Sequence, residues 1–311
     1  MHLVNTLVPV FLLIGLGFVL RKSNFLTGDL VGGINKLVYW VGLPALLFIE
    51  VATAAYDLGR AATPFFAMFI AISVCIVVAY WAAAALKLSG PSVGAFVQGT
   101  FHGNTVYVGL PVLAYSVADL PGVDAPQTTQ LAVLVLAMIM PFYLVASVIV
   151  LLLGRHRLDR SAPRRIARRL ITNPFILACV AGLCWGVSGL HMPWAIQRAF
   201  DATAQMALPL ALIATGAMIT GRKSGVISPA ALWSTAIKIG VGPLAGYLAG
   251  KAMGLDTGQM HVVLILLAVP TAVSSLVLAD QLDSDSGLAA DIIVISSVLS
   301  IGSLAAVLAI A

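Results

Sequence analysis

The sequence predicts an all-α membrane protein with ten transmembrane helices, and three observations carry this prediction. Of the 311 residues, 60% are hydrophobic and only 9% are charged, with a mean hydropathy of +1.04. Soluble domains carry about 25% charged residues. The apolar residues form ten stretches that are long enough to cross a bilayer. Two of these stretches, 93–117 and 258–280, are interrupted near their middle by glycine, proline and polar residues.

A membrane-spanning helix needs about 20 mostly apolar residues. By this measure we expect spans at residues 3–20, 31–50, 62–86, 93–117, 129–153, 173–190, 198–219, 230–252, 258–280 and 288–310. The first span is expected to be retained rather than cleaved, because no basic residue precedes it and Arg21-Lys22 follow it. Within this span, Gly15-Leu-Gly17 is expected to allow close helix contact.

The basic residues indicate the orientation. With the N-terminus outside, 13 of the 17 lysines and arginines fall in inner loops, and the C-terminus is then outside as well. The positive-inside rule favours this arrangement. The longest inner loop, residues 154–172, carries seven arginines. We expect these arginines to contact anionic lipid headgroups rather than nucleic acid.

The same basic loop divides the chain into two halves, residues 1–153 and 173–311, with five spans in each. Because five is odd, the second half enters the membrane from the opposite side. Gly42-Leu-Pro-Ala-Leu-Leu47 resembles Ala207-Leu-Pro-Leu-Ala-Leu212 at an offset of 165 residues, and Gly103-Asn104 aligns with Pro270-Thr271 at an offset of 167. The sequence therefore predicts a five-plus-five inverted repeat.

The two interrupted spans predict a substrate site. A bilayer core supplies no water, so a broken helix survives there only when it is buried in protein or lines a polar cavity. Secondary transporters build substrate sites from such half-helix ends. If the helices restart at Asn104 and Thr271, two N-termini with unpaired N–H groups suit a carboxylate. The predicted substrate-binding residues are His102, Gly103, Asn104, Thr105, Pro270, Thr271 and Ser274. The alternative is that Asn104 only satisfies freed backbone carbonyls.

Two titratable residues are candidates for coupling or ion pairing. His102 borders the break, and a histidine that titrates near neutrality can carry a coupling proton or pair with an anion. The alternative is a histidine satisfied by a neighbouring carbonyl. Lys238 lies inside a span, where an isolated lysine costs on the order of 3 kcal/mol, so a partner, a cavity or snorkelling to the inner face is expected. Gln98, Tyr107 and Tyr143 are further candidates for lining a cavity.

These residues resemble the auxin efflux carrier family, which includes plant PIN auxin transporters and bacterial carriers of malonate and other organic anions. The resemblance rests on Gly103-Asn-Thr-Val-Tyr-Val-Gly-Leu-Pro-Val-Leu113, Asn173-Pro174, Gly242-Pro243 and Ala268-Val-Pro-Thr271. It implies the PIN-like fold shared with bile-acid symporters, in which spans four and nine are unwound and cross. It further implies a scaffold of spans 1, 2, 6 and 7, a mobile transport domain of spans 3–5 and 8–10, and a bacterial inner membrane.

Plant members differ at two points, since they have a long central loop and commonly carry proline where this chain has Gly103. The predicted function is secondary transport of a small organic anion by an elevator-type movement. The expected partners are this anion, membrane lipids, protons as a candidate coupling ion, and a second copy in a candidate homodimer. No cofactor is expected. No metal site or disulfide is expected either, because Cys75, Cys179 and Cys184 all fall inside apolar segments.

Three other functions compete with this prediction. A sodium-coupled symporter of the bile-acid type would need carboxylates beside the crossing, and none occurs within 93–117 or 258–279. An ion channel would need rings of charge or carbonyl filters. An enzyme is not expected, because the sequence has no His-Glu-x-x-His motif and no pair of deep aspartates. The sequence leaves open which anion is carried, in which direction, and with what coupling.

Overall fold

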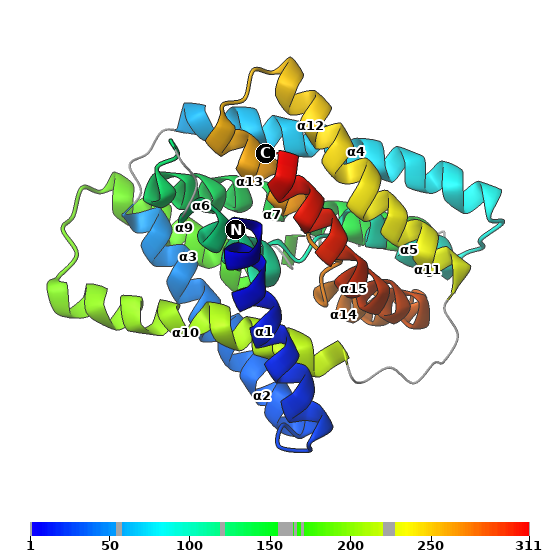
Figure 1. The fold of residues 1–311 in the computed structure, drawn as a ribbon, viewed down its shortest axis with the longest axis horizontal. Helices are drawn as coiled ribbons and strands as arrows, with labels where there is room; N and C mark the ends of the chain where they lie inside the picture. Colours follow the sequence, from blue (N-terminus) through cyan, green and yellow to red (C-terminus); the bar gives the residue numbers. More distant parts are fainter. Residues whose placement is uncertain are drawn as a thin grey trace. The chain divides into compact units, whose positions relative to one another are not determined.

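The computed structural model describes residues 2–53, 58–118, 122–154, 164, 167–168, 171–219 and 228–310, and the named secondary-structure elements in this part of the chain are all helices (Figure 1). Each of the ten predicted stretches coincides with one helix or with a run of consecutive helices. Most of the basic loop 154–172, with most of the arginines expected to contact lipid headgroups, lies outside the described residues.

The first half of the chain supplies three uninterrupted helices and two interrupted runs. The uninterrupted helices are α1 (His2–Lys22), α4 (Leu58–Ala85) and α7 (Ala125–Gly154). The interrupted runs are α2 (Gly28–Leu37), η1 (Val38–Gly42) and α3 (Leu43–Ala52), followed later by α5 (Pro91–Phe101), η2 (Thr105–Gly109) and α6 (Leu110–Ala118). The three η segments found in the described residues are π-helical.

The second half follows a similar plan. Its helices are α9 (Pro174–Val187), α10 (Trp194–Ile219), α11 (Pro229–Ala236), η3 (Ile237–Val241), α12 (Gly242–Ala252), α13 (Thr257–Ala268), α14 (Ser274–Gln281) and α15 (Ser286–Ile310). Within the described part of the chain, four helical segments are long and apolar enough to cross a bilayer: Gly28–Ile49, Gly59–Ala85, Ala125–Gly154 and Ser286–Ile310. Together with the shorter apolar helices, they make this an integral membrane protein.

Each π-helical segment ends two residues before a proline, namely Pro44, Pro111 or Pro243. A proline has no N–H, and its ring clashes with the carbonyl four residues earlier, so the helix must widen or bend there. For Pro243 the freed carbonyl belongs to Ile239, which accepts a hydrogen bond from Ser303 Oγ of α15 at 2.8 Å. Within a membrane such a carbonyl needs a protein partner, because lipid cannot supply one.

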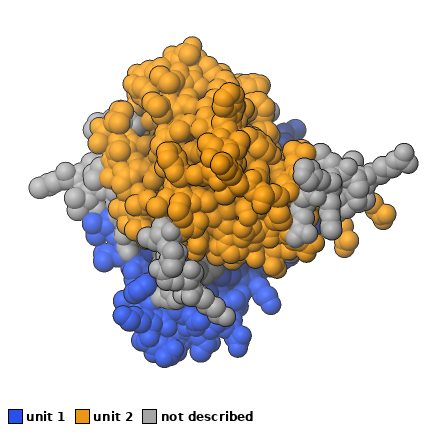
Figure 2. Space-filling view, turned by 90° about the vertical axis from the view of Figure 1, so that its right-hand side faces the viewer, with its two compact units in different colours: residues 1–58, 106–137, 170–221 blue, residues 59–105, 138–169, 222–311 orange. Residues whose placement is uncertain are grey.

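The chain divides into two compact units, coloured separately in Figure 2. Unit 1 comprises residues 1–58, 106–137 and 170–221, and unit 2 comprises residues 59–105, 138–169 and 222–311. Unit 1 therefore holds α1–α3, α6, the first part of α7, α9 and α10. Unit 2 holds α4, α5, the rest of α7 and α11–α15.

Glycines bring the helices of unit 1 close together. In the α1–α10 pair, a Cβ atom on Gly17 would overlap the carbonyl oxygen of Ile213, and one on Gly216 would overlap that of Ile14. Small residues at such crossings let two backbones approach. The predicted role of Gly15-Leu-Gly17 is thus confirmed for Gly17, whereas a Cβ on Gly15 would meet nothing within 4 Å.

The half-helices that lead into the two interruptions are enclosed by unit 2. α13 is buried at every residue from Gly258 to Ala268, and α5 is buried from Gly94 to Phe101. α5 packs against α11, α14 and α15, and α13 packs against α12 and α15. Both helices therefore end inside protein rather than at a surface.

Candidate functional site

The two interrupted spans meet at their breaks, as the sequence predicts. After α5 and α13 end, the two chains form an isolated antiparallel bridge between Gly103 and Thr271. Asn104 N–H donates to the Pro270 carbonyl at 2.7 Å, and Ala272 N–H donates to the His102 carbonyl at 2.9 Å. The predicted discontinuity of both spans is confirmed. The bridge, hereafter the crossing, lies within unit 2.

The amide groups at the crossing differ from the expectation. Asn104 N–H is bonded to Pro270, and Thr271 N–H donates to Ser296 Oγ at 3.0 Å. The expectation that these two amides are bare is therefore wrong. Both helices also restart later than expected, at Thr105 instead of Asn104 and at Ser274 instead of Thr271. Gly103 and Thr271 form a non-hydrogen-bonded pair, so the Gly103 N–H points away from the Thr271 segment. No described residue accepts a hydrogen bond from this N–H.

Hydroxyl groups from elsewhere in unit 2 bond to carbonyls of α5. Ser234 Oγ donates to the Phe96 carbonyl at 2.9 Å, and Thr271 Oγ1 donates to the Gly99 carbonyl at 2.8 Å. Gly99 lies in the last turn of α5, where a carbonyl has no partner in its own helix and needs one wherever water is absent. These bonds are inaccessible to solvent and fix the geometry of the break.

Lys238 provides a buried positive charge at the crossing. Its side chain is 1% exposed, and its Nζ donates to the Leu267 carbonyl in the last turn of α13 at 2.8 Å. A Cβ atom on Gly103 would lie 3.1 Å from the same Nζ. The ammonium thus meets the negative end of a helix dipole. The expectation that Lys238 snorkels to the inner face is therefore wrong. No carboxylate of the described residues forms an ion pair with Lys238.

His102 caps the end of α5 and connects three elements of unit 2. Its Nδ1 lies 2.8 Å from Ser147 Oγ of α7, and its Nε2 lies 3.5 Å from Ser274 Oγ at the start of α14. The imidazole stacks on the ring of Tyr143, with centroids 5.5 Å apart and planes at 8°. Ser147 is fully buried, whereas Ser274 is exposed. The ring is therefore held by a hydroxyl and an aromatic face, not by a backbone carbonyl.

The remaining predicted site residues gather around the same bridge. Asn104 is 6% exposed, Thr105 2% and Thr271 1%. The Asn104 amide makes no hydrogen bond with any described residue, so the alternative that it caps freed carbonyls is not observed. The structure brings the predicted binding residues of both spans together, with Lys238 beside them.

Several polar groups near the crossing were not predicted from sequence. Ser296 bonds to Thr271, Ser147 bonds to His102, and Ser234 bonds to α5 at Phe96. Nothing in their local sequence distinguishes these serines from others in apolar spans. Buried polar atoms without a partner in the described residues also belong to unit 2: the amide of Gln98, Thr235 Oγ1, Ser275 Oγ and Tyr143 Oη. Buried polar groups normally bind protein, water or a ligand.

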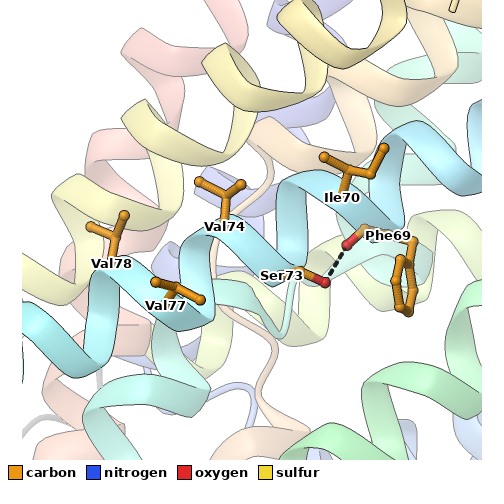
Figure 3. Close-up of a pocket in the computed structure, with 6 residues that line it drawn as sticks. All are labelled: Phe69, Ile70, Ser73, Val74, Val77 and Val78. Carbon is orange, nitrogen blue, oxygen red and sulfur yellow. Dashed lines mark hydrogen bonds between the residues drawn. The ribbon is translucent and has the colours of Figure 1, made fainter.

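Two recesses elsewhere suit an organic anion less well. An apolar groove runs along α4 (Figure 3), and its one hydroxyl, on Ser73, donates to the Phe69 carbonyl at 2.8 Å. The groove offers hydrocarbon contact only. A polar recess of unit 1 is lined by Ile49, Thr53, Pro126, Thr129, Gln130, Gln197 and Asp201. The Asp201 carboxylate disfavours an anion there.

One pattern typical of hydrolases occurs at residues 90–94, Gly-Pro-Ser-Val-Gly. In such enzymes the serine sits on a strand-to-helix turn with a histidine in reach. Here it lies in the first turn of a helix that follows another helix, and Ser92 Oγ donates to Asp285 Oδ2 at 2.7 Å. This bond ties α5 to the start of α15 and gives no nucleophile–base pair.

Comparison with known proteins agrees with these features. The family model described as "Membrane transport protein" matches residues 2–308. The chain is also 27% identical, over 321 aligned positions, to a protein of Rhizobium meliloti (strain 1021) named "Putative malonate transporter". This alignment covers 99% of the chain and 95% of the relative.

Proposed function

The chain belongs to the membrane transport protein family, and on this premise we propose that it is a secondary transporter of a small organic anion that binds at the crossing. The observation that carries the proposal is the Lys238 ammonium, which is buried beside the crossing without a carboxylate partner among the described residues. A buried charge is costly unless it is paired. A bound anion supplies the missing charge.

The neighbouring side chains suit a carboxylate. His102 and Asn104 carry N–H groups on the two sides of the Gly103 amide, which itself has no acceptor among the described residues. Charge-assisted hydrogen bonds to carboxylates are stronger than neutral ones. Because the crossing offers one full positive charge and several neutral donors, a small dicarboxylate fits as well as a monocarboxylate. The malonate named in the relative's description makes malonate the first compound to test.

For the mechanism we propose an elevator-type movement in which unit 1 is the scaffold and unit 2 carries the substrate. Two of the boundaries between the units fall within described helical segments at weakened points. One point is the Thr105/Val106 junction at the break, and the other is Ala137/Met138, where Pro141 removes the hydrogen bond to the Ala137 carbonyl. The division into two units supports a scaffold that contains spans 1, 2, 6 and 7. Unit 1 also contains residues 106–137, which belong to spans four and five.

We further propose ten spans arranged as a five-plus-five inverted repeat, residues 1–153 and 173–311 joined by the linker 154–172. Two contacts support the repeat, and each joins matching segments of the two aligned halves. A Cβ on Gly42 would lie 3.2 Å from Cβ of Ala207, its equivalent at an offset of 165. At the offset of 167, Pro270 is the equivalent of Gly103 and Thr271 is the equivalent of Asn104. At the crossing, Gly103 pairs with Thr271, and Asn104 bonds to Pro270. A two-fold axis between the segments produces such a pattern.

The proposed setting is a bacterial inner membrane with both termini outside, with protons as the coupling ion and a homodimer as the assembly. The test is uptake of radiolabelled malonate into liposomes that contain the purified protein, under a proton gradient, a sodium gradient or neither. We expect saturable uptake that is inhibited by related carboxylates and does not require sodium. Absence of uptake for every organic acid that raises the thermal stability of the protein would contradict the proposal.

A further inference from the structure

We propose that Ser147 holds neutral His102 in the tautomer that carries its proton on Nε2, so that the imidazole presents an N–H donor to the carboxylate of the substrate. The inference deepens the proposed function and rests on it for the identity of the acceptor. Ser147 is then a positioning residue, which acts on the substrate through His102. Its place in α7, 45 residues from His102 in the sequence, gave no indication of this role.

The first step concerns the proton of the Ser147 hydroxyl. Hydroxyl groups inside helices usually donate to a carbonyl of their own helix. Ser73, Thr129 and Ser297 do so in this protein, at 2.7–2.9 Å. The described residues provide no such bond for Ser147, whose contact is with His102 Nδ1 at 2.8 Å. The serine proton is therefore available to Nδ1.

The second step concerns the imidazole. A neutral histidine has one ring nitrogen that donates and one that accepts. When Ser147 donates to Nδ1, that nitrogen is the acceptor and the ring proton resides on Nε2. Because Ser147 is 0% exposed, solvent does not offer its hydroxyl proton another acceptor. The hydroxyl thereby sets the tautomer, as the hydrogen bond at one histidine nitrogen generally does.

The third step concerns the direction in which Nε2 of His102 points. Tyr143 lies one turn before Ser147 on α7 and stacks in parallel on the imidazole, which fixes the plane of the ring. A flip of the ring by 180° would replace Nδ1 with a carbon atom and break the 2.8 Å bond. Nε2 therefore points to the other side, where the nearest recorded partner is the exposed Ser274 at 3.5 Å. This distance is at the limit of a hydrogen bond, so the donor remains available.

Among the described residues, the Lys238 ammonium of η3 and the Tyr143 phenol of α7 face this part of the crossing from neighbouring elements. Lys238 meets the charge of an anion, but an ammonium on a flexible stem provides little direction. A planar N–H donor in a fixed orientation adds that direction. The two residues together select a carboxylate that presents an oxygen to each of them.

The direct test is nitrogen NMR of the purified protein labelled with [15N]histidine, without substrate. The His102 signals are assigned by their loss in His102→Gln. We expect a proton-bearing Nε2 and an unprotonated Nδ1 in the wild type, unchanged in Ser147→Thr, and a mixture of tautomers in Ser147→Ala. The matched control is Ser73→Ala, which removes a helix serine that bonds to its own helix. A proton on Nδ1 in the wild type would overturn the proposal, whether or not any variant folds.

Transport provides the second readout. In Ser147→Ala we expect KM for malonate to rise about tenfold, the effect of about 1.4 kcal/mol of lost binding, with Ser147→Thr close to wild type. Unchanged KM in Ser147→Ala, at wild-type thermal stability, would overturn the proposal. The NMR result separates the two hypotheses, since an intact Nε2–H signal in a protein that transports no carboxylate would contradict the proposed function and leave the tautomer assignment supported.

Discussion

Lys238 Nζ donates a hydrogen bond to the carbonyl oxygen of Leu267 at 2.8 Å, one residue before α13 ends at the crossing. The lysine belongs to a π-helical segment, and the leucine belongs to a half-helix buried on all sides. One contact thus places a full positive charge against the end of a helix and next to Gly103. The predictions below follow from this arrangement and from the groups around it.

Replacement of Lys238 by methionine keeps the length of the side chain and removes its charge. We expect loss of saturable malonate uptake and a fall in the free energy of unfolding of about 1–3 kcal/mol, because the Leu267 carbonyl stays buried without a donor. Uptake kinetics and thermal unfolding measure the two effects. Lys251→Met, which changes an exposed lysine of α12, is the control. Wild-type uptake in Lys238→Met would show that the ammonium has no part in anion binding.

Gly103→Ala tests the space at the crossing. The new Cβ would lie 3.0 Å from Val269 Cγ2 and 3.1 Å from Lys238 Nζ, so the ammonium or the bridge has to shift. We expect KM for malonate to rise about tenfold, which corresponds to about 1.4 kcal/mol. Gly302→Ala, where a Cβ would meet nothing within 4 Å, should leave uptake unchanged. Equal kinetics in both variants would mean that the geometry at Gly103 does not govern binding.

Asn104→Ala tests direct contact between the amide and the substrate. The side chain makes no hydrogen bond with a described residue, so we expect the unfolding temperature to change little. A hydrogen bond to a charged group contributes about 1.5–3 kcal/mol, so we expect KM to rise by about one to two orders of magnitude. Asn104→Gln retains the amide group and should recover part of the affinity. The site assignment fails if saturable uptake survives Asn104→Ala intact.

His102→Ala tests proton coupling. A coupling residue takes up a proton in one step of the transport cycle and releases it in another. If His102 carries the coupling proton, the rate of uptake by the wild type depends on pH and the rate of uptake by the variant does not. The initial rate of malonate uptake is measured in steps of pH, with an imposed proton gradient and without one. The same pH profile in both proteins would exclude His102 as the proton carrier.

The α1–α10 contact in unit 1 is open to a matched pair of substitutions. Gly17→Leu places a side chain where the Ile213 carbonyl lies, and overpacking of this kind typically costs about 1–3 kcal/mol. Gly15→Leu introduces the same side chain two residues earlier, where a Cβ would meet nothing within 4 Å. We expect a lower unfolding temperature for Gly17→Leu only. Equal effects would indicate that close helix approach is not what the glycine provides.

Much of the fold could be predicted from the sequence because a bilayer restricts it so strongly. Apolar length locates the helices, and a Gly-Asn or Pro-Thr interruption in an apolar stretch predicts a break that must be buried. The positions of Gly103, Asn104, Pro270 and Thr271 at one crossing follow from these rules together with the alignment of the two halves.

The partners at the crossing could not be predicted, because they depend on packing between distant helices. Ser296 takes up the Thr271 amide, and Ser147 contacts His102, but each resembles other serines in apolar helices. The expectation that the Asn104 and Thr271 amides have no acceptor was wrong because both N–H groups bond to residues on distant segments. The separation of residues 106–137 from the rest of spans four and five depends on three-dimensional contacts as well.

Calorimetric titration of malonate into the purified protein tests most directly whether the crossing with its buried lysine binds the anion. We expect saturable binding to the wild type and to Lys251→Met, and no measurable binding to Lys238→Met at equal folded fraction. Malonate that binds Lys238→Met with wild-type affinity would contradict the account.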